Sequence, residues 1–137
     1  MKFLVDANVL SEMAKPAPSP SVVGWFQLNN LDSVVNPIIL GEIEYGILSR
    51  AAGRRKKQLL EWFEDGVRTL PVVPIDAVTS SLWAKLLSEL RRKDQSMSIN
   101  DSLIAATSKQ HQLIVVTRNV AHYRHAGVRI VNPFDTE

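Results

Sequence analysis

The chain has 137 residues, of which 45% are hydrophobic and 22% are charged, which predicts one globular domain over residues 1–137 with its own core. The absence of cysteine excludes disulfides, thiolate zinc sites, iron–sulfur clusters and cysteine nucleophiles. The formal net charge is +2 and the sequence pI is about 9.1, so a nucleic-acid partner is permitted but not required.

The first predicted element is a short apolar strand. Residues 3–5 read Phe-Leu-Val, and the polar Asp6 ends the run. An unbroken apolar run is typical of a strand buried on both faces, as in a parallel sheet. The run is too short for a signal peptide, and no stretch reaches the roughly 18 apolar residues of a membrane helix. We therefore expect a cytoplasmic protein with no membrane partner.

Helices and strands are predicted to alternate along the rest of the first half. In the helix that starts at Ile38, Leu40, Ile43 and Ile47 fall on one apolar stripe. The expected elements are, in order, helix 9–14, helix 21–28 capped by Ser21, strand 33–35, a helix from 38 that breaks at Gly53, and helix 54–63.

The second half continues this alternation. Strand 72–75 is expected near a sheet edge because of Pro74. An amphipathic helix over 78–90 is predicted from apolar residues every four positions, namely Val78, Leu82, Leu86 and Leu90. A polar loop over 91–97, a helix over 98–109, and strands over 113–116 and 128–131 complete the chain.

This alternation predicts an α/β fold, a three-layer sandwich with a central, mostly parallel sheet and helices on both faces. The functional cleft of such a sheet lies beyond the carboxyl ends of its strands. That rule selects Asp6, Asn36 and the segment 117–119 (Thr-Arg-Asn) as residues to examine.

Three acidic residues are predicted near that edge. Asp6 ends a strand, and Glu42 and Asp101 lie in the first turns of their helices. Each has a plainer explanation as a turn, dipole or capping residue. However, Asp101 shares a helix face with Ile104 and Ala105, so it points inward or toward a cleft, where a carboxylate needs a partner. Carboxylates held this close together favour the binding of a hard divalent cation, Mg²⁺ or Mn²⁺. A site of this kind indicates hydrolysis of phosphodiesters.

Four segments of the chain form an ordered set, namely 3–12 (Phe-Leu-Val-Asp-Ala-Asn-Val-Leu-Ser-Glu), 39–47 (Ile-Leu-Gly-Glu-Ile-Glu-Tyr-Gly-Ile), 100–108 (Asn-Asp-Ser-Leu-Ile-Ala-Ala-Thr-Ser), and 116–119 (Val-Thr-Arg-Asn) with the ending 131–134 (Val-Asn-Pro-Phe). In this order they resemble the motifs of PIN-domain ribonucleases, most closely the VapC/FitB branch of bacterial type II toxins. Any one segment is a weak signal, but the ordered set covers essentially the whole chain.

The resemblance implies a Mg²⁺-dependent endoribonuclease, with Mn²⁺ as an alternative ion. It implies Asp6, Glu42 and Asp101 as catalytic acids, with the metal held mainly by Asp6 and Asp101. It also implies a PIN-like fold, an RNA substrate, a cognate antitoxin and a homodimer. Further residues are expected to support the acids or to touch substrate, namely Asn8, Thr117, Asn119 and His122.

Two positions depart from the family pattern. Ala7 stands where threonine is common, and His122 replaces the usual fourth acid in the segment 120–123 (Val-Ala-His-Tyr). One negative charge fewer is expected to weaken the binding of a cation. A catalytically weakened PIN domain that binds RNA or an antitoxin therefore stays open as the alternative function.

Basic residues supply candidate contacts to RNA phosphates. They are Arg50, Arg54, Arg55, Arg118 and Arg124. A solvated helix surface explains the first three equally well.

Two other folds that place carboxylates at strand ends fit poorly. A haloacid dehalogenase needs a second aspartate at Asn8, and a receiver domain needs an acid pair, an acceptor aspartate and a late lysine that this chain lacks.

Overall fold

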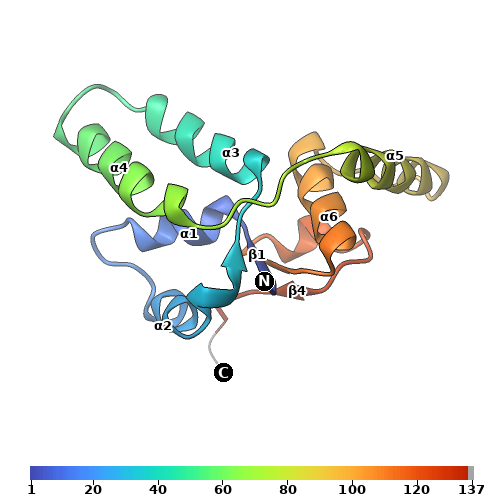
Figure 1. The fold of residues 1–137 in the computed structure, drawn as a ribbon, viewed down its shortest axis with the longest axis horizontal. Coiled ribbons are helices and arrows are strands. Elements are labelled where there is room, and N and C mark those ends of the chain that lie inside the picture. The colour runs from blue at the N-terminus through green and yellow to red at the C-terminus, as the bar shows by residue number, and fades with distance from the viewer. Residues whose placement is uncertain (136–137) are drawn as a thin grey trace.

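The computed structural model describes residues 1–135 and contains a parallel sheet with the strand order β2-β1-β3-β4 (Figure 1). The strands are β1 (Phe3–Val5), β2 (Ser33–Val34), β3 (Ile114–Val116) and β4 (Ile130–Val131). The central strand β1 pairs with β2 on one side and with β3 on the other. All three strand pairs are parallel, as predicted.

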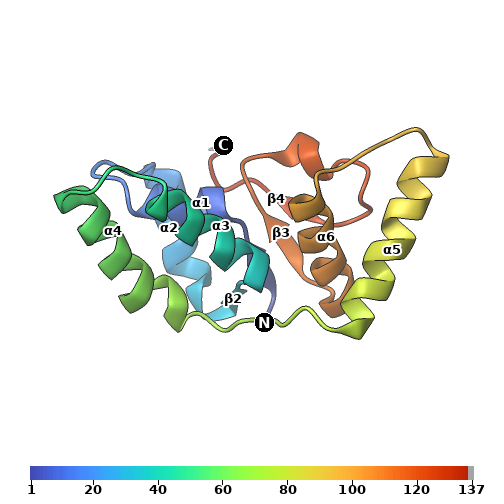
Figure 2. The same ribbon diagram turned by 90° about the horizontal axis from the view of Figure 1, so that it is seen from above.

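Helices cover both faces of the sheet, which confirms the predicted three-layer α/β architecture (Figure 2). They are α1 (Ala7–Met13), α2 (Pro20–Asn29), α3 (Pro37–Leu48), α4 (Arg54–Asp65), α5 (Ala77–Arg92) and α6 (Ile99–His111), with short 3₁₀ helices η1 (Asn30–Asp32), η2 (Val67–Thr69) and η3 (Val120–Tyr123). Figure 2 shows α1 to α4 on one side and α5 and α6 on the other. None of the helices described is long and apolar enough to cross a bilayer.

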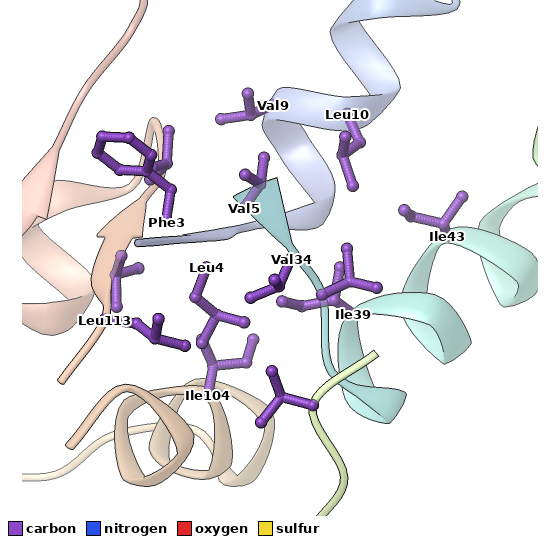
Figure 3. Close-up of a cluster of buried hydrophobic side chains, with 14 of the residues drawn as sticks. Phe3, Leu4, Val5, Val9, Leu10, Val34, Ile39, Ile43, Ile104 and Leu113 are labelled. Atoms are coloured by element: carbon purple, nitrogen blue, oxygen red, sulfur yellow. The ribbon is translucent and has the colours of Figure 1, made fainter. Parts of the chain in front are cut away.

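The core lies between the sheet and these two helical layers. Leu4 and Val115, from the two central strands, are fully buried. Ile39 of α3 and Ile104 of α6 are also fully buried and lie with Leu4 in the same apolar cluster (Figure 3). Full burial of one such side chain stabilises the fold by about 1.5–3 kcal/mol. This packing fixes β1 and β3, and therefore the positions of the polar residues that follow them.

The predicted start of the helix over 21–28 and the predicted strand over 72–75 are wrong. Helix α2 starts at Pro20 rather than at Ser21, since proline is well suited to the first helical position. Residues 72–75 form no regular strand, only one bridge between Val35 and Val72, because Pro71 and Pro74 have no N–H to donate.

The predicted apolar stripe of α5 is confirmed at Leu86 and Leu90, which are buried, but is wrong at its first position. Val78 is 57% exposed, whereas Thr79 is buried and takes part in a capping box with Asp76. This cap fixes the first turn with Thr79 facing inward. Helix α5 then continues to Arg92, so the loop expected from residue 91 begins later.

Asn36 is a structural residue rather than part of a cleft. Its side-chain oxygen accepts the N–H of Ile39 at 3.0 Å and caps α3. Its amide donates to the hydroxyl oxygen of Thr107 at 3.0 Å, and the residue is fully buried. Asn36 therefore links α3 to α6 across the end of β2.

Candidate active site

Asp6 lies at the carboxyl end of β1 and is the N-cap of α1. Its Oδ1 accepts the backbone N–H of Ala7 at 2.8 Å. Its Oδ2 accepts hydrogen bonds from the hydroxyls of Thr117 at 2.8 Å and Tyr123 at 3.3 Å. The residue is only 5% exposed. Both carboxylate oxygens of Asp6 are thus held by donors from three different segments of the chain.

A polar network around Thr117 joins the ends of β1 and β3. The Asn8 amide donates to Asp6 Oδ2 at 3.3 Å and to Thr117 Oγ1 at 3.2 Å. The oxygen of the same amide accepts the N–H of Arg118 at 3.0 Å. Asn119 joins the network through its backbone N–H, which donates to Thr117 Oγ1 at 3.1 Å. The structure therefore brings three of the four predicted supporting residues to Asp6.

Asp101 lies in the first turn of α6, facing the same end of the sheet. Its backbone N–H donates to Ser98 Oγ at 3.1 Å, so Ser98 caps the helix as predicted. Its Oδ1 accepts the hydroxyl of Tyr123 at 3.1 Å, and its Oδ2 lies 3.3 Å from Nδ1 of His122. The Asp101 side chain is 19% exposed, so it lies at the mouth of the site. His122, the residue at the usual place of a fourth acid, thus contacts Asp101 directly.

Tyr123 is the residue of this site that the sequence reasoning missed. Its hydroxyl reaches both Asp6 and Asp101, and its side chain is fully buried. Burial, together with the charges of the two aspartates, raises the pKa of the Tyr123 hydroxyl far above its usual range, so the group is a hydrogen-bond donor at neutral pH. The sequence offered one signal for this role, since Tyr123 carries a hydroxyl at an otherwise apolar position at the end of the fourth motif.

Glu42 faces the two aspartates from α3. Its Oε2 accepts the Asn100 amide at 3.3 Å. Its Oε1 is buried and has no hydrogen-bond partner among the described residues. Burial raises the pKa of the Glu42 carboxyl, Asn100 opposes this shift, and the charges of Asp6 and Asp101 add to it. An unpartnered buried carboxylate oxygen is costly unless another group satisfies it.

The acids also influence each other. Burial raises the pKa of the Asp6 carboxyl, and the charge of Asp101 adds to this rise. Hydrogen bonds from Thr117, Ala7 and Tyr123 act in the opposite direction. The site is therefore an electronegative pocket in which every added negative charge is unfavourable until a cation enters.

The fit of this pocket to a divalent cation is looser than the sequence suggested. Over residues 1–135, no three histidine or acidic side chains lie close enough together to form a metal cage as they stand. Mg²⁺, however, keeps several waters and needs only one or two carboxylates. Asp6 and Asp101 share the hydroxyl of Tyr123, and Glu42 offers a free oxygen beside them. The donors are all oxygens, so the residues present fit Mg²⁺ or Mn²⁺.

A hollow of about 300 Å³ leads from Glu42 along α1, α3 and α4. Asn8 and Glu42 line it near the acids, and Arg50 and Arg55 line it as well. The Arg55 guanidinium donates to the carbonyl oxygen of Ala14 at 2.6 Å, whereas Arg50 is exposed. Two of the predicted RNA-binding arginines therefore border the site.

The other three predicted arginines lie in different surroundings. Arg54 lines a neighbouring hollow that also includes Arg50. The Arg118 guanidinium lies 4.6 Å from the centre of the Phe134 ring. Arg124 is exposed directly after η3. Arg50 is therefore an exposed arginine in the same hollow that Glu42 lines.

Comparison of the sequence with known proteins gives consistent matches over nearly all of its length. The PIN domain family model matches residues 3–128. Toxin FitB of Neisseria gonorrhoeae is 31% identical, covering 96% of this chain and 98% of that protein. The tRNA(fMet)-specific endonuclease VapC of Shigella flexneri is 27% identical, with 93% of each chain covered.

Solved structures give the same result. FitAcB from Neisseria gonorrhoeae matches with a TM-score of 0.88 and 30% identity, over 98% of this chain and 99% of that one. DNA-bound VapBC from Salmonella typhimurium matches with a TM-score of 0.85 and 25% identity, over 97% and 98%.

Proposed function

Because the chain belongs to the PIN domain family, as its motifs predicted, we propose that it is the toxin of a type II toxin–antitoxin pair and acts as a metal-dependent endoribonuclease. Relatives that cover nearly the whole chain are named as a toxin and as an RNA endonuclease, which supports this proposal. The observation that carries it is the acidic pocket, in which the Tyr123 hydroxyl contacts both Asp6 and Asp101. The charges of these aspartates act on Glu42, whose buried Oε1 has no hydrogen-bond partner among the described residues.

In this proposal Asp6 and Asp101 hold one Mg²⁺ or Mn²⁺, and Glu42 assists directly or through water. Such an ion supplies Lewis acidity for the attack of water on a phosphodiester. Thr117 and Asn8 keep the Asp6 carboxylate in one orientation by donating to its Oδ2. We assign to Glu42 the role of accepting a proton from water, which its buried Oε1, without a hydrogen-bond partner among the described residues, supports.

RNA would enter along the arginine-lined hollow. Arg50 and Arg55 would neutralise phosphates on one side of the acids. Arg54, Arg118 and Arg124 would add weaker contacts around the rim. An RNA substrate implies action in the cytoplasm, which is part of the same proposal.

The proposed partners are a cognate antitoxin and a second copy of this chain. The structural relatives are toxin–antitoxin complexes, which supports the first. An arginine of the antitoxin could enter the acidic pocket and form bidentate hydrogen bonds with its carboxylates, and this would block the site. The homodimer follows from the family alone, and sedimentation at micromolar concentration tests it.

The enzymatic proposal is tested by RNA cleavage with the purified chain. We expect cleavage that EDTA abolishes and that Mg²⁺ or Mn²⁺ restores. Asp101→Asn should lower the rate roughly 100-fold or more, the scale on which a lost electrostatic group in an active site acts. Asp65→Asn, on the exposed end of α4, is the control and should cleave like the wild type.

The same experiment addresses the alternative of a weakened PIN domain. Replacement of the usual fourth acid by His122 favours that alternative. Full retention of antitoxin binding with no metal-dependent cleavage of any RNA would replace the enzyme with a binding module.

A further inference from the structure

Tyr123 has a hydroxyl that packing alone does not require. It ends η3, whose other residues are exposed, and its ring is fully buried. Phenylalanine would fill the same space without the cost of a buried polar group. The hydroxyl lies 3.1 Å from Asp101 Oδ1 and 3.3 Å from Asp6 Oδ2. Among residues 1–135, its hydrogen-bond partners are therefore the two acids of the site alone.

The hydroxyl group of a tyrosine has a single hydrogen, so it donates a full hydrogen bond to one carboxylate at a time. The Tyr123 hydroxyl can therefore donate its hydrogen bond to either Asp6 or Asp101. It keeps the two oxygens that face it, Asp6 Oδ2 and Asp101 Oδ1, close to the same hydroxyl. The opposite oxygens are less occupied. Within the part of the chain that the structure describes, Asp6 Oδ1 accepts only the Ala7 N–H, and Asp101 Oδ2 has a polar contact only with His122. Each aspartate thus keeps an oxygen with a spare lone pair for another ligand.

We propose that Tyr123 is a positioning residue, whose hydroxyl sets the separation and rotation of the Asp6 and Asp101 carboxylates before a divalent cation binds. This inference rests on the proposed function, because it assumes that these two aspartates hold the ion. The ion itself does not need to contact the phenol.

The expected consequence follows from electrostatics. Without the shared donor, two carboxylates in a buried pocket repel each other, and Asp101 at the pocket mouth turns away first. Asp6 remains fixed by Thr117 and Asn8. A cation must then reorganise Asp101 on binding. Loss of a group that orients a metal ligand typically weakens metal affinity about 10–100-fold, and we expect a loss within that range.

The test is direct titration of Mn²⁺ and Mg²⁺ into the full chain by calorimetry, with no RNA present. Tyr123→Phe keeps the ring and its packing and removes only the hydroxyl. Tyr45→Phe makes the same chemical change on a side chain that is 75% exposed and is the matched control. We expect weaker binding only for Tyr123→Phe, with wild-type affinity for Tyr45→Phe.

Thermal unfolding in EDTA separates positioning from stability. A Tyr123→Phe chain that melts lower but binds Mn²⁺ as tightly as the wild type would make the hydroxyl merely structural and overturn the inference. Tighter binding would also overturn it, because the phenol would then be a competitor of the ion. A wild-type chain that binds no divalent ion would instead reject the proposed function, and the inference with it.

Discussion

At the scale of single residues, Asp6 combines a structural and a chemical task in one carboxylate. Its Oδ1 caps α1, and its Oδ2 accepts the hydroxyls of Thr117 and Tyr123 inside the site. Asparagine caps helices about as well as aspartate, whereas alanine in a cap costs about 0.5–2 kcal/mol. A variant that removes only the charge of Asp6 must therefore be Asp6→Asn, because Asp6→Ala would change the fold and the chemistry together.

The residue types of the site could be predicted from sequence better than their contacts. Asp6 and Asp101 follow from strand ends and helix starts, whose positions depend on local patterns. The role of Tyr123 could not be read in this way, because η3 must first turn its side chain inward toward two segments far away in the chain. Asn119 was predicted through its side chain, but it joins the network through its backbone.

The half-buried carboxyl of Glu42 gives a prediction for the dependence of stability on pH. Its pKa is raised in the folded chain, so the folded state binds more protons than the unfolded state above the ordinary value of 4.5. The contribution of Glu42 to the free energy of unfolding is therefore fully present below pH 4.5. It is lost as the pH rises through the pKa that Glu42 has in the folded chain. Glu42→Gln removes this loss and still accepts from Asn100.

We expect Glu42→Gln to unfold at higher urea than the wild type at pH 7 in EDTA, with the difference shrinking as the pH approaches 4.5. Urea titrations of both chains across this range measure it. Glu44→Gln, two residues along the same helix, is the control. A stability difference that does not change with pH would contradict an origin in the charge of Glu42.

At the scale of elements, the site is built from helix starts that meet the carboxyl ends of strands. Asp6 caps α1 directly after β1, and Asp101 lies in the first turn of α6. Most elements were predicted because apolar period and capping residues agree. The failures occurred where a local feature overrides the period, such as Pro71 and Pro74 beside the expected strand 72–75, or the capping box of α5.

The cap of α6 should matter for chemistry as well as for stability. Ser98 Oγ accepts the N–H of Asp101, so it fixes the first turn that carries this acid. Ser98→Ala should lower the free energy of unfolding by about 1 kcal/mol and should also weaken Mn²⁺ binding. Asp76→Ala removes the cap of α5, so it should lower stability similarly and leave Mn²⁺ binding unchanged.

Urea unfolding and Mn²⁺ calorimetry on both variants provide the comparison. Equal Mn²⁺ affinities for Ser98→Ala and Asp76→Ala would mean that the first turn of α6 does not control the position of Asp101.

At the scale of the whole molecule, the small net charge conceals an uneven distribution. The acids lie at one edge of the sheet, and the hollow lined by Arg50 and Arg55 opens from them. Figure 2 shows α5 beyond α6, on the opposite side of the sheet from α3 and α4. Composition could not predict this arrangement, because it depends on α1, α3 and α4 packing together. The motif order, in contrast, was sufficient to predict the family and the α/β fold.

This distribution of charge predicts which arginine makes RNA binding depend on the salt concentration. Arg50 is the suitable residue to change, because Arg55 also bonds to the Ala14 carbonyl and its loss would disturb the end of α1.

In a chain carrying Asp101→Asn, so that RNA is bound but not cleaved, Arg50→Gln should weaken RNA binding. Each lost phosphate contact on a single strand should lower the slope of log affinity against log salt by about 0.7. Arg92→Gln removes the same charge from the end of α5 and should leave the slope unchanged. Fluorescence anisotropy with a labelled RNA over a range of salt concentrations measures both slopes. Equal slopes for the two variants would mean that RNA does not follow the hollow beside Glu42, and that the arginines there belong to a solvated helix surface.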